Sequence, residues 1–143
     1  MLVNRSIPLS TVIPVLVYPD VGEAVAWLCA TFGFTPRIRI SNHRAQLAVG
    51  DGAVIVSEPR DDLRPPRPGE VSASVLVRID DATRHHDLAR ERGARILQPL
   101  GDHPFGERQY TAEDLAGHRW TFSQSIADVA PEDWGGTPSS ADT

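Results

Sequence analysis

The stretch TVIPVLVYPDVGEAVAWLCATFGF, residues 11–34, holds a strand-like run, a helix start and a helix stop in that order. Up to Tyr18 it is rich in valine, isoleucine and leucine, which is typical of a β-strand. Asp20 precedes a run with apolar side chains at helical spacing, and Gly33 follows that run. Aspartate caps the first turn of a helix, and glycine adopts the left-handed conformation that ends one. The stretch therefore predicts a strand followed by a buried helix.

The same series of features returns 60 residues later, in the region of SASVLVRID, residues 72–80. Six pairs of positions match at this offset: Val15 and Val75, Leu16 and Leu76, Val17 and Val77, Asp20 and Asp80, Leu28 and Leu88, Gly33 and Gly93. Each pair has its own mechanical role, as a strand residue, a helix cap or a buried helix position. The chain is therefore predicted to contain two copies of one structural unit.

The second predicted helix is expected to be more exposed than the first. The first carries one apolar stripe, made of Val21, Ala24, Val25, Leu28 and Phe32. The matching positions of the second are Asp81, Arg84, His85, Leu88 and Arg92. Of the adjacent histidines 85 and 86, one is expected to lie partly against the sheet and the other in solvent.

Three short strand-like runs follow each predicted helix: TPRIRIS, RAQLAVG and AVIVSE in the first half, and ARILQP, RQYTAED and HRWTFSQ in the second. The segment PRDDLRPPRPGE, residues 59–70, carries four prolines and separates the halves. We predict an α+β fold of two βαβββ modules. It would form one domain over 1–124, with module one at about 8–58, module two at about 71–124, and a loosely ordered tail at 125–143.

Composition excludes several classes of function. The chain has 143 residues, 41% of them hydrophobic and 23% charged, as in an ordinary soluble domain. All 14 basic residues are arginine, so Schiff-base lysine chemistry and a P-loop are excluded. A net charge of −5 argues against a nucleic-acid partner. Cys29 is the only cysteine, and no apolar run is long enough for a bilayer, so we expect a cytoplasmic protein without a membrane partner.

The duplicated unit and a late Asp-x-x-Gly-His turn, Asp114 to His118, resemble the vicinal oxygen chelate superfamily. That superfamily includes glyoxalase I, extradiol dioxygenases, fosfomycin resistance enzymes and bleomycin-binding proteins. The resemblance covers about residues 8–124. It implies an open, curved mixed sheet with a cleft, usually completed by a homodimer. It does not indicate one activity, because a single scaffold there hosts both enzymes and binders.

The resemblance also implies where a metal would be held. Metal-dependent members place His or Glu on the first strand of each module and Glu or a similar residue near the end of the last strand. Those positions here hold Ile13, Ser74 and Thr121, and the remaining first-module position falls near Ile55. Isoleucine is no ligand, and neutral hydroxyls are poor ligands for divalent transition metals. We therefore predict no metal and no other cofactor.

The leading hypothesis is a metal-independent protein that binds a small molecule, similar to the bleomycin-binding branch, and sequesters an antibiotic or a metabolite. One alternative is a metal-dependent lyase, isomerase or dioxygenase with non-standard ligands drawn from His43, Glu58, His103 and His118. Another is a metal-free lyase or isomerase that uses Arg108, Tyr110 or His118. His118 itself is expected in a turn, where it bonds to neighbouring backbone.

Side chains alternate along a strand, so Thr121 and Ser123 share one face of the last strand, and Trp120 and Phe122 share the other. We expect Thr121 to face the cleft and the two aromatic residues to pack under a helix. Arg108 and Tyr110 would share a face of the neighbouring strand, although Arg108 can instead pair with a nearby acid. The predicted ligand contacts are Arg108, Tyr110, Thr121, Ser74, Val15 and His43.

Overall fold

The computed structural model describes residues 1–139 and confirms two βαβββ modules. Module one contains β1 (Val15–Val17), α1 (Val21–Phe32), β2 (Thr35–Ile40), β3 (Arg44–Val49) and β4 (Gly52–Ser57). Module two contains β5 (Ser74–Arg78), α2 (Ala82–Glu91), β6 (Arg95–Asp102), β7 (Glu107–Glu113) and β8 (Arg119–Ser125). A short 3-10 helix, η1 (Pro131–Trp134), follows. Each of the predicted strands is present.

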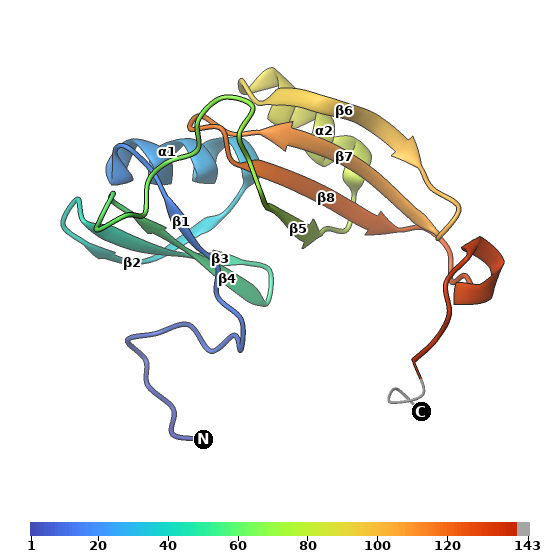
Figure 1. Cartoon of the computed structure of the whole chain (residues 1–143), viewed down its shortest axis with the longest axis horizontal. Helices are drawn as coiled ribbons and strands as arrows, with labels where there is room; N and C mark the ends of the chain where they lie inside the picture. The colour runs from blue at the N-terminus through green and yellow to red at the C-terminus, as the bar shows by residue number, and fades with distance from the viewer. Residues whose placement is uncertain (140–143) are drawn as a thin grey trace.

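Each module forms its own four-stranded mixed sheet, in the order β1-β4-β3-β2 or β5-β8-β7-β6. The first strand of each module pairs in parallel with the last, and the other pairings are antiparallel. Figure 1 shows both helices on one side of the sheets, so that the molecule forms an arch. We call the side of each sheet turned away from the helices its open face.

Over the first strand and the start of the helix the two modules are related by an offset of 61 residues, so the predicted offset of 60 is wrong by one there. The glycines that end the helices, Gly33 and Gly93, both have positive φ and keep the predicted offset of 60. The side chain of Asp20 accepts a hydrogen bond from the Glu23 amide at 2.9 Å, and that of Asp81, not Asp80, accepts one from the Arg84 amide at 3.0 Å. Both neighbouring aspartates can cap a helix, and only the path of the chain selects the second. As a consequence, Val15 corresponds to Leu76.

The helices confirm the predicted contrast in exposure. Six residues of α1 are buried, whereas α2 buries only Ala82 and Ala89. Gly33 has the left-handed conformation that ends α1, with φ of 79°. Neither helix within residues 1–139 combines the length and apolar character needed to cross a bilayer.

Aromatic side chains join the modules into one core. Phe32, at the end of α1, lies 5.8 Å from Trp120 and 4.8 Å from Phe122, measured between ring centroids. Both partners belong to β8 of module two and are fully buried, as predicted for the helix side of that strand. Phe34 also contacts Trp120, at 5.2 Å. The hydrophobic core is therefore continuous between the modules.

A buried carboxylate, Asp114, bridges the same junction. Its Oδ2 accepts the Tyr18 hydroxyl of module one at 2.6 Å and the Trp120 indole N–H at 3.0 Å. Its Oδ1 accepts the backbone amides of Ala116 and His118, both at 3.0 Å. Burial, with the nearby Asp114 carboxylate, raises the pKa of Tyr18, so the phenol stays protonated and donates. Four donors thus converge on one carboxylate that is only 6% exposed.

The middle of the tail contacts module two. Trp134 of η1 contacts Phe105 at 5.3 Å between ring centroids, and the Ile126 amide donates to the Gly106 carbonyl at 2.8 Å. These contacts attach the tail to the turn between β6 and β7. Residues 140–143 of the expected tail lie outside the described residues.

Candidate functional site

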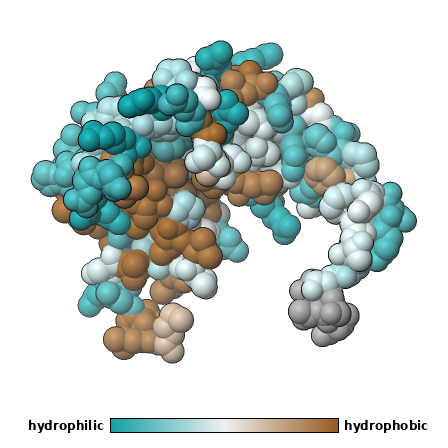
Figure 2. Space-filling view, in the orientation of Figure 1, coloured by the Kyte–Doolittle hydropathy of each residue, from teal (hydrophilic) through white to brown (hydrophobic). Residues whose placement is uncertain are grey.

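The arch encloses a hollow on its open side, and the two sheets differ in the chemistry they present there. Figure 2 shows hydrophobic residues gathered on the side of module one and mostly hydrophilic residues on the side of module two. Residues before β1 contribute to the first side: the Ser6 carbonyl accepts a hydrogen bond from Gln46 on β3 at 2.9 Å. We did not expect this contact, because backbone acceptors leave no signal in the sequence.

The open face of module two carries a row of polar side chains. The hydroxyls of Thr111 and Thr121 are 2.8 Å apart, and Thr111 also donates to the side-chain Oε1 of Gln98 at 3.4 Å. The side-chain Nε2 of Gln98 has no partner among residues 1–139. A cavity of about 370 Å³ lies over this row, lined by residues 71–74, Gln98, Thr111, Arg119 and Thr121. Thr121, which we expected to face the cleft, lines this cavity, and its contact with a ligand stays a prediction.

A second, more apolar cavity of about 270 Å³ lies where the two modules meet under the arch. It is lined by Val12, Pro14, residues 49–54 and residues 75–78. Val12 and Leu76 are 78% and 61% exposed, which is unusual for such large apolar side chains. The hollow therefore offers an apolar surface beside the polar row, a combination suited to a small organic molecule.

The strand pairing shows which residues lie beside the positions where the resemblance implies metal ligands. Val15 pairs with Ile55 in module one, and Leu76 pairs with Thr121 in module two. Ser74 pairs with Arg119 instead, and Ile13 precedes β1. None of these side chains is an imidazole, a carboxylate or a thiol. Residues 1–139 contain no group of three His, Cys, Asp or Glu side chains close enough to hold a metal ion.

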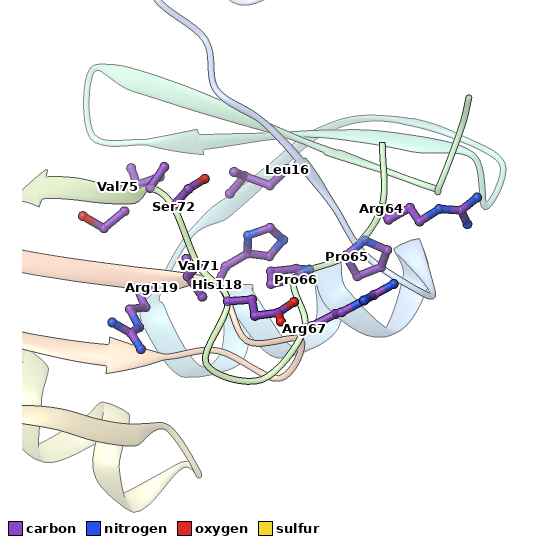
Figure 3. Close-up of a pocket in the computed structure, with 13 residues that line it drawn as sticks. Leu16, Arg64, Pro65, Pro66, Arg67, Val71, Ser72, Val75, His118 and Arg119 are labelled. Carbon is purple, nitrogen blue, oxygen red and sulfur yellow. The ribbon is translucent and has the colours of Figure 1, made fainter. Parts of the chain in front are cut away.

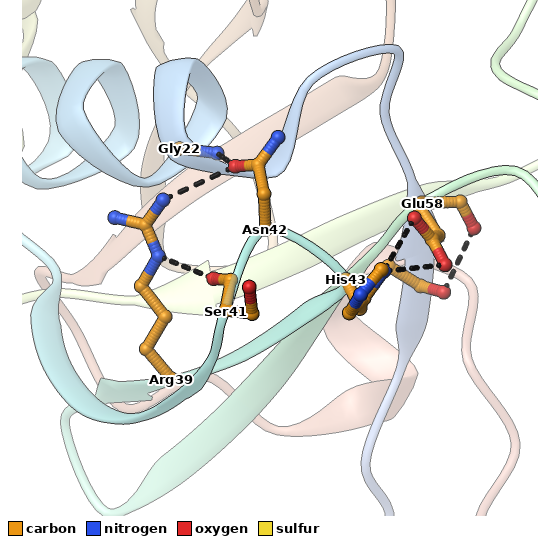
Figure 4. A network of polar contacts seen from close by, with 7 residues as sticks. Gly22, Arg39, Ser41, Asn42, His43 and Glu58 are labelled. Atoms are coloured by element: carbon orange, nitrogen blue, oxygen red, sulfur yellow. Dashed lines mark hydrogen bonds and ion pairs between the residues drawn. The ribbon is translucent and has the colours of Figure 1, made fainter.

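The four candidates for a non-standard metal site lie in three separate places. His43 and Glu58 are paired through Nδ1 at 3.0 Å, and both side chains are exposed at one end of module one (Figure 4). His103 stacks on Phe105 at the turn between β6 and β7. His118 lies at the junction of the modules. His43 also lines none of the cavities described above, so its predicted ligand contact stays a prediction.

Arg108 and Tyr110 share a face of β7 as predicted, but that face is turned toward the helices. Tyr110 pairs with Phe122 and is 1% exposed, and its hydroxyl contacts Nδ1 of His85. Arg108 pairs with Asp102 at 2.7 and 3.2 Å across the β6–β7 hairpin. Alternation gives the residues that share a face without telling which face meets a helix. The expected common wall of these two residues with Thr121 is not formed.

His118 has a wider role in the junction than the predicted turn contact. Its Nε2 donates to the Val17 carbonyl of β1 at 2.7 Å, and its ring lies 4.7 Å from that of Tyr18. The ring also lines a further cavity of about 390 Å³, shown in Figure 3. The spacing of residues 114–118 identified a turn, but it carried no sign of the partner strand one hundred residues earlier.

His85 couples the α2 helix to the junction. The neutral imidazole donates from Nε2 to the Phe32 carbonyl at 3.0 Å, while Nδ1 accepts from the Tyr110 hydroxyl. Burial lowers the pKa of His85, and the hydrogen bond to Phe32 offsets this only in part. The unfolded chain therefore takes up a proton more readily than the folded protein does.

We expect acidification to weaken the fold through His85. The stabilisation that neutral His85 contributes is complete above about pH 6.5, the pKa of histidine in the unfolded chain. It is lost as the pH falls through the lower pKa that His85 has in the folded protein. His85→Gln should cost about 1–2 kcal/mol at pH 7.5 by weakening two hydrogen bonds, and should flatten the decline below pH 6.5. Urea unfolding at several pH values measures both effects. His43→Gln, at an exposed histidine, is the control, and an unchanged pH slope in His85→Gln would contradict the assignment.

Comparisons with known proteins agree with this architecture. The chain matches the family model of the Glyoxalase/Bleomycin resistance protein/Dioxygenase superfamily over residues 11–122. The crystal structure of TioX from Micromonospora sp. ML1 is 34% identical, has a TM-score of 0.69, and matches over 82% of this chain and 99% of TioX. No curated protein matches the chain.

More distant structures share the fold alone. A glyoxalase/bleomycin resistance protein/dioxygenase from Nocardioides is 16% identical, with a TM-score of 0.66, over 91% of this chain and 87% of that one. A glyoxalase/bleomycin resistance protein from Streptomyces sp. CB03234 is 20% identical, with a TM-score of 0.65, over 78% of this chain and 97% of that one.

Proposed function

The chain belongs to the Glyoxalase/Bleomycin resistance protein/Dioxygenase superfamily, and we propose that within it the protein binds a small molecule without a metal. The ligand would lie in the hollow between the open faces of the two sheets. Sequestration of an antibiotic or a metabolite is the biological role that this proposal favours.

One observation carries the proposal: the donor set on the open faces. The paired positions hold Val15 with Ile55 and Leu76 with Thr121, which together offer a single hydroxyl. Transition metals in proteins are held by imidazole, thiolate and carboxylate groups, so these residues do not fit the metal that other members of the superfamily use. The same positions suit contacts with an organic ligand, apolar on one side and hydrogen-bonding on the other.

We further propose that two copies pair, so that the hollow of each is closed by its partner. The exposed apolar side chains of Val12, Val15 and Leu76 support this pairing, because burying apolar surface between two copies stabilises the dimer. Sedimentation equilibrium would test the pairing directly, and a monomer throughout the micromolar range would contradict it.

A thermal-shift panel tests the binding proposal. Metal-free bleomycin, planar aromatic antibiotics, S-substituted glutathiones and first-row divalent metals would be compared with and without a chelator. Binding to the folded state raises the melting temperature by mass action, so an organic member should stabilise the protein equally in both conditions. Strong stabilisation by zinc, nickel or iron, with no effect of the organic compounds, would overturn the proposal.

Leu76→Arg should block binding in the hollow. An arginine at this exposed position places a charge on the apolar surface, and we expect at least about tenfold weaker binding of the organic compound that stabilises the parent protein most. Titration calorimetry would measure the affinity. Leu63→Arg, at a 53% exposed leucine of the linker outside the described cavities, is the matched control. An equal loss of affinity in both variants would show that the compound does not bind in the hollow.

A further inference from the structure

The cavity that His118 lines adjoins the hollow at the junction of the modules. This junction pocket has a volume of about 390 Å³. Its walls come from the linker and the start of β5 (residues 64–67 and 70–75), from Leu16 of β1, and from the β7–β8 turn (His118 and Arg119). Figure 3 shows Arg64 and Arg67 on one side of His118 and Arg119 on the other.

The charge of the junction pocket is opposite to that of the whole protein. Arg64, Arg67 and Arg119 line it against one acid, Glu70, while the chain carries a net charge of −5. None of these three arginines has an acidic partner within 4.0 Å among residues 1–139. Arg108, in contrast, is held by Asp102. All three arginines are exposed residues, so their side chains are free to turn toward an anion at the opening.

Neutral polar groups complete the lining. The hydroxyls of Ser72 and Ser74 lie in the wall, and His118 is fixed there by its hydrogen bond to the Val17 carbonyl. Because Nε2 donates that hydrogen bond, Nδ1 is left to face a ligand. No other partner of the ring nitrogens is present among residues 1–139.

We propose that the junction pocket binds an oxyanion, either a phosphate or a carboxylate group. The planar guanidinium donates two parallel hydrogen bonds to such groups, which makes arginine the residue of choice for them. Ser74 and Arg119 line both this pocket and the cavity over the polar row of module two. The oxyanion can therefore be a free ion or the anionic end of a larger molecule. The assignment does not depend on binding in the hollow.

Titration calorimetry at low salt with inorganic phosphate and, separately, malonate tests the assignment. The parent protein should bind at least one of them in a saturable way. Arg67→Gln and Arg119→Gln should each weaken that binding by about tenfold, because each removes charge-assisted hydrogen bonds. Arg84→Gln changes the net charge equally but lies on α2, outside the described pockets, so its affinity should stay within about twofold.

Glu70→Gln tests the sign of the effect. Removal of the one acid of the pocket should strengthen binding of the same probe, whereas a fold defect would weaken it. Preference for phosphate or for malonate identifies the source of the oxyanion. The assignment is overturned if neither anion binds, or if Arg84→Gln weakens binding as much as Arg119→Gln does. Leu76→Arg should leave phosphate and malonate binding unchanged, which separates this site from the hollow.

Discussion

Asp114→Ala is expected to lower the free energy of unfolding by about 3–5 kcal/mol, because four donors lose their common acceptor inside the protein. Two of them, the Tyr18 hydroxyl and the Trp120 indole, come from fully buried side chains. Removing one partner of a buried network costs more than the network contributes, because the remaining groups stay desolvated. Urea unfolding followed by tryptophan fluorescence measures the loss.

Asp114→Asn should be nearly as damaging, since an amide nitrogen would face a donor on one side of the carboxylate. Tyr18→Phe should cost only about 1–2 kcal/mol, because three donors still hold the carboxylate. In a double-mutant cycle, Asp114→Ala and Tyr18→Phe should be clearly non-additive. Asp128→Asn, at an exposed acid, is the control. A loss of less than about 1 kcal/mol in Asp114→Ala would show that this network contributes little to the stability of the fold.

Phe32→Ala is expected to cost about 3–5 kcal/mol, the range for deleting a buried aromatic side chain. Phe32 is 4% exposed and contacts Phe34 of its own module together with Trp120, Phe122 and His85 of the other. The cavity left by the ring would lie between the modules. Calorimetric unfolding measures the loss, and hydrogen exchange shows whether amides of α1 and α2 lose protection together.

Phe105→Ala is the matched control, since it deletes the same side chain at a site whose aromatic partners among residues 1–139 are His103 and Trp134 alone. Because Phe105 is half-buried, this substitution should lower the free energy of unfolding much less, by about 1 kcal/mol, and should affect mainly the tail. If the two phenylalanines cost the same, or if Phe32→Ala loosens only one module, the junction does not couple the modules.

Much of the fold could be predicted because its signals are local. A helix cap at Asp20, a left-handed glycine at position 33 and strands of alternating character each follow from a few neighbouring residues. The error of one residue in the repeat arose at the adjacent aspartates 80 and 81. Either can cap a helix, and the choice depends on how β5 and α2 pack.

The candidate site was harder to predict because it depends on which face of each strand meets a helix. Thr121 was placed correctly, since its neighbours Trp120 and Phe122 are large aromatic residues with a clear preference for the core. Tyr110 was misplaced because a phenol suits either a cleft or a core with a partner for its hydroxyl. That partner, His85, stands on a helix whose sequence indicated exposure. The junction pocket left no local signal, as its walls come from segments far apart in the chain.

The bond between Tyr18 and Asp114 also limits how this protein can be recombined. The two halves repeat one order of helix and strands, yet each completes the interior of the other. A chimera that takes its first half from a homologue without a phenol at position 18 loses one of the four donors to Asp114. We therefore expect a crossover within the linker to cost about 1–2 kcal/mol of stability unless the donor of the first half also carries tyrosine at this position.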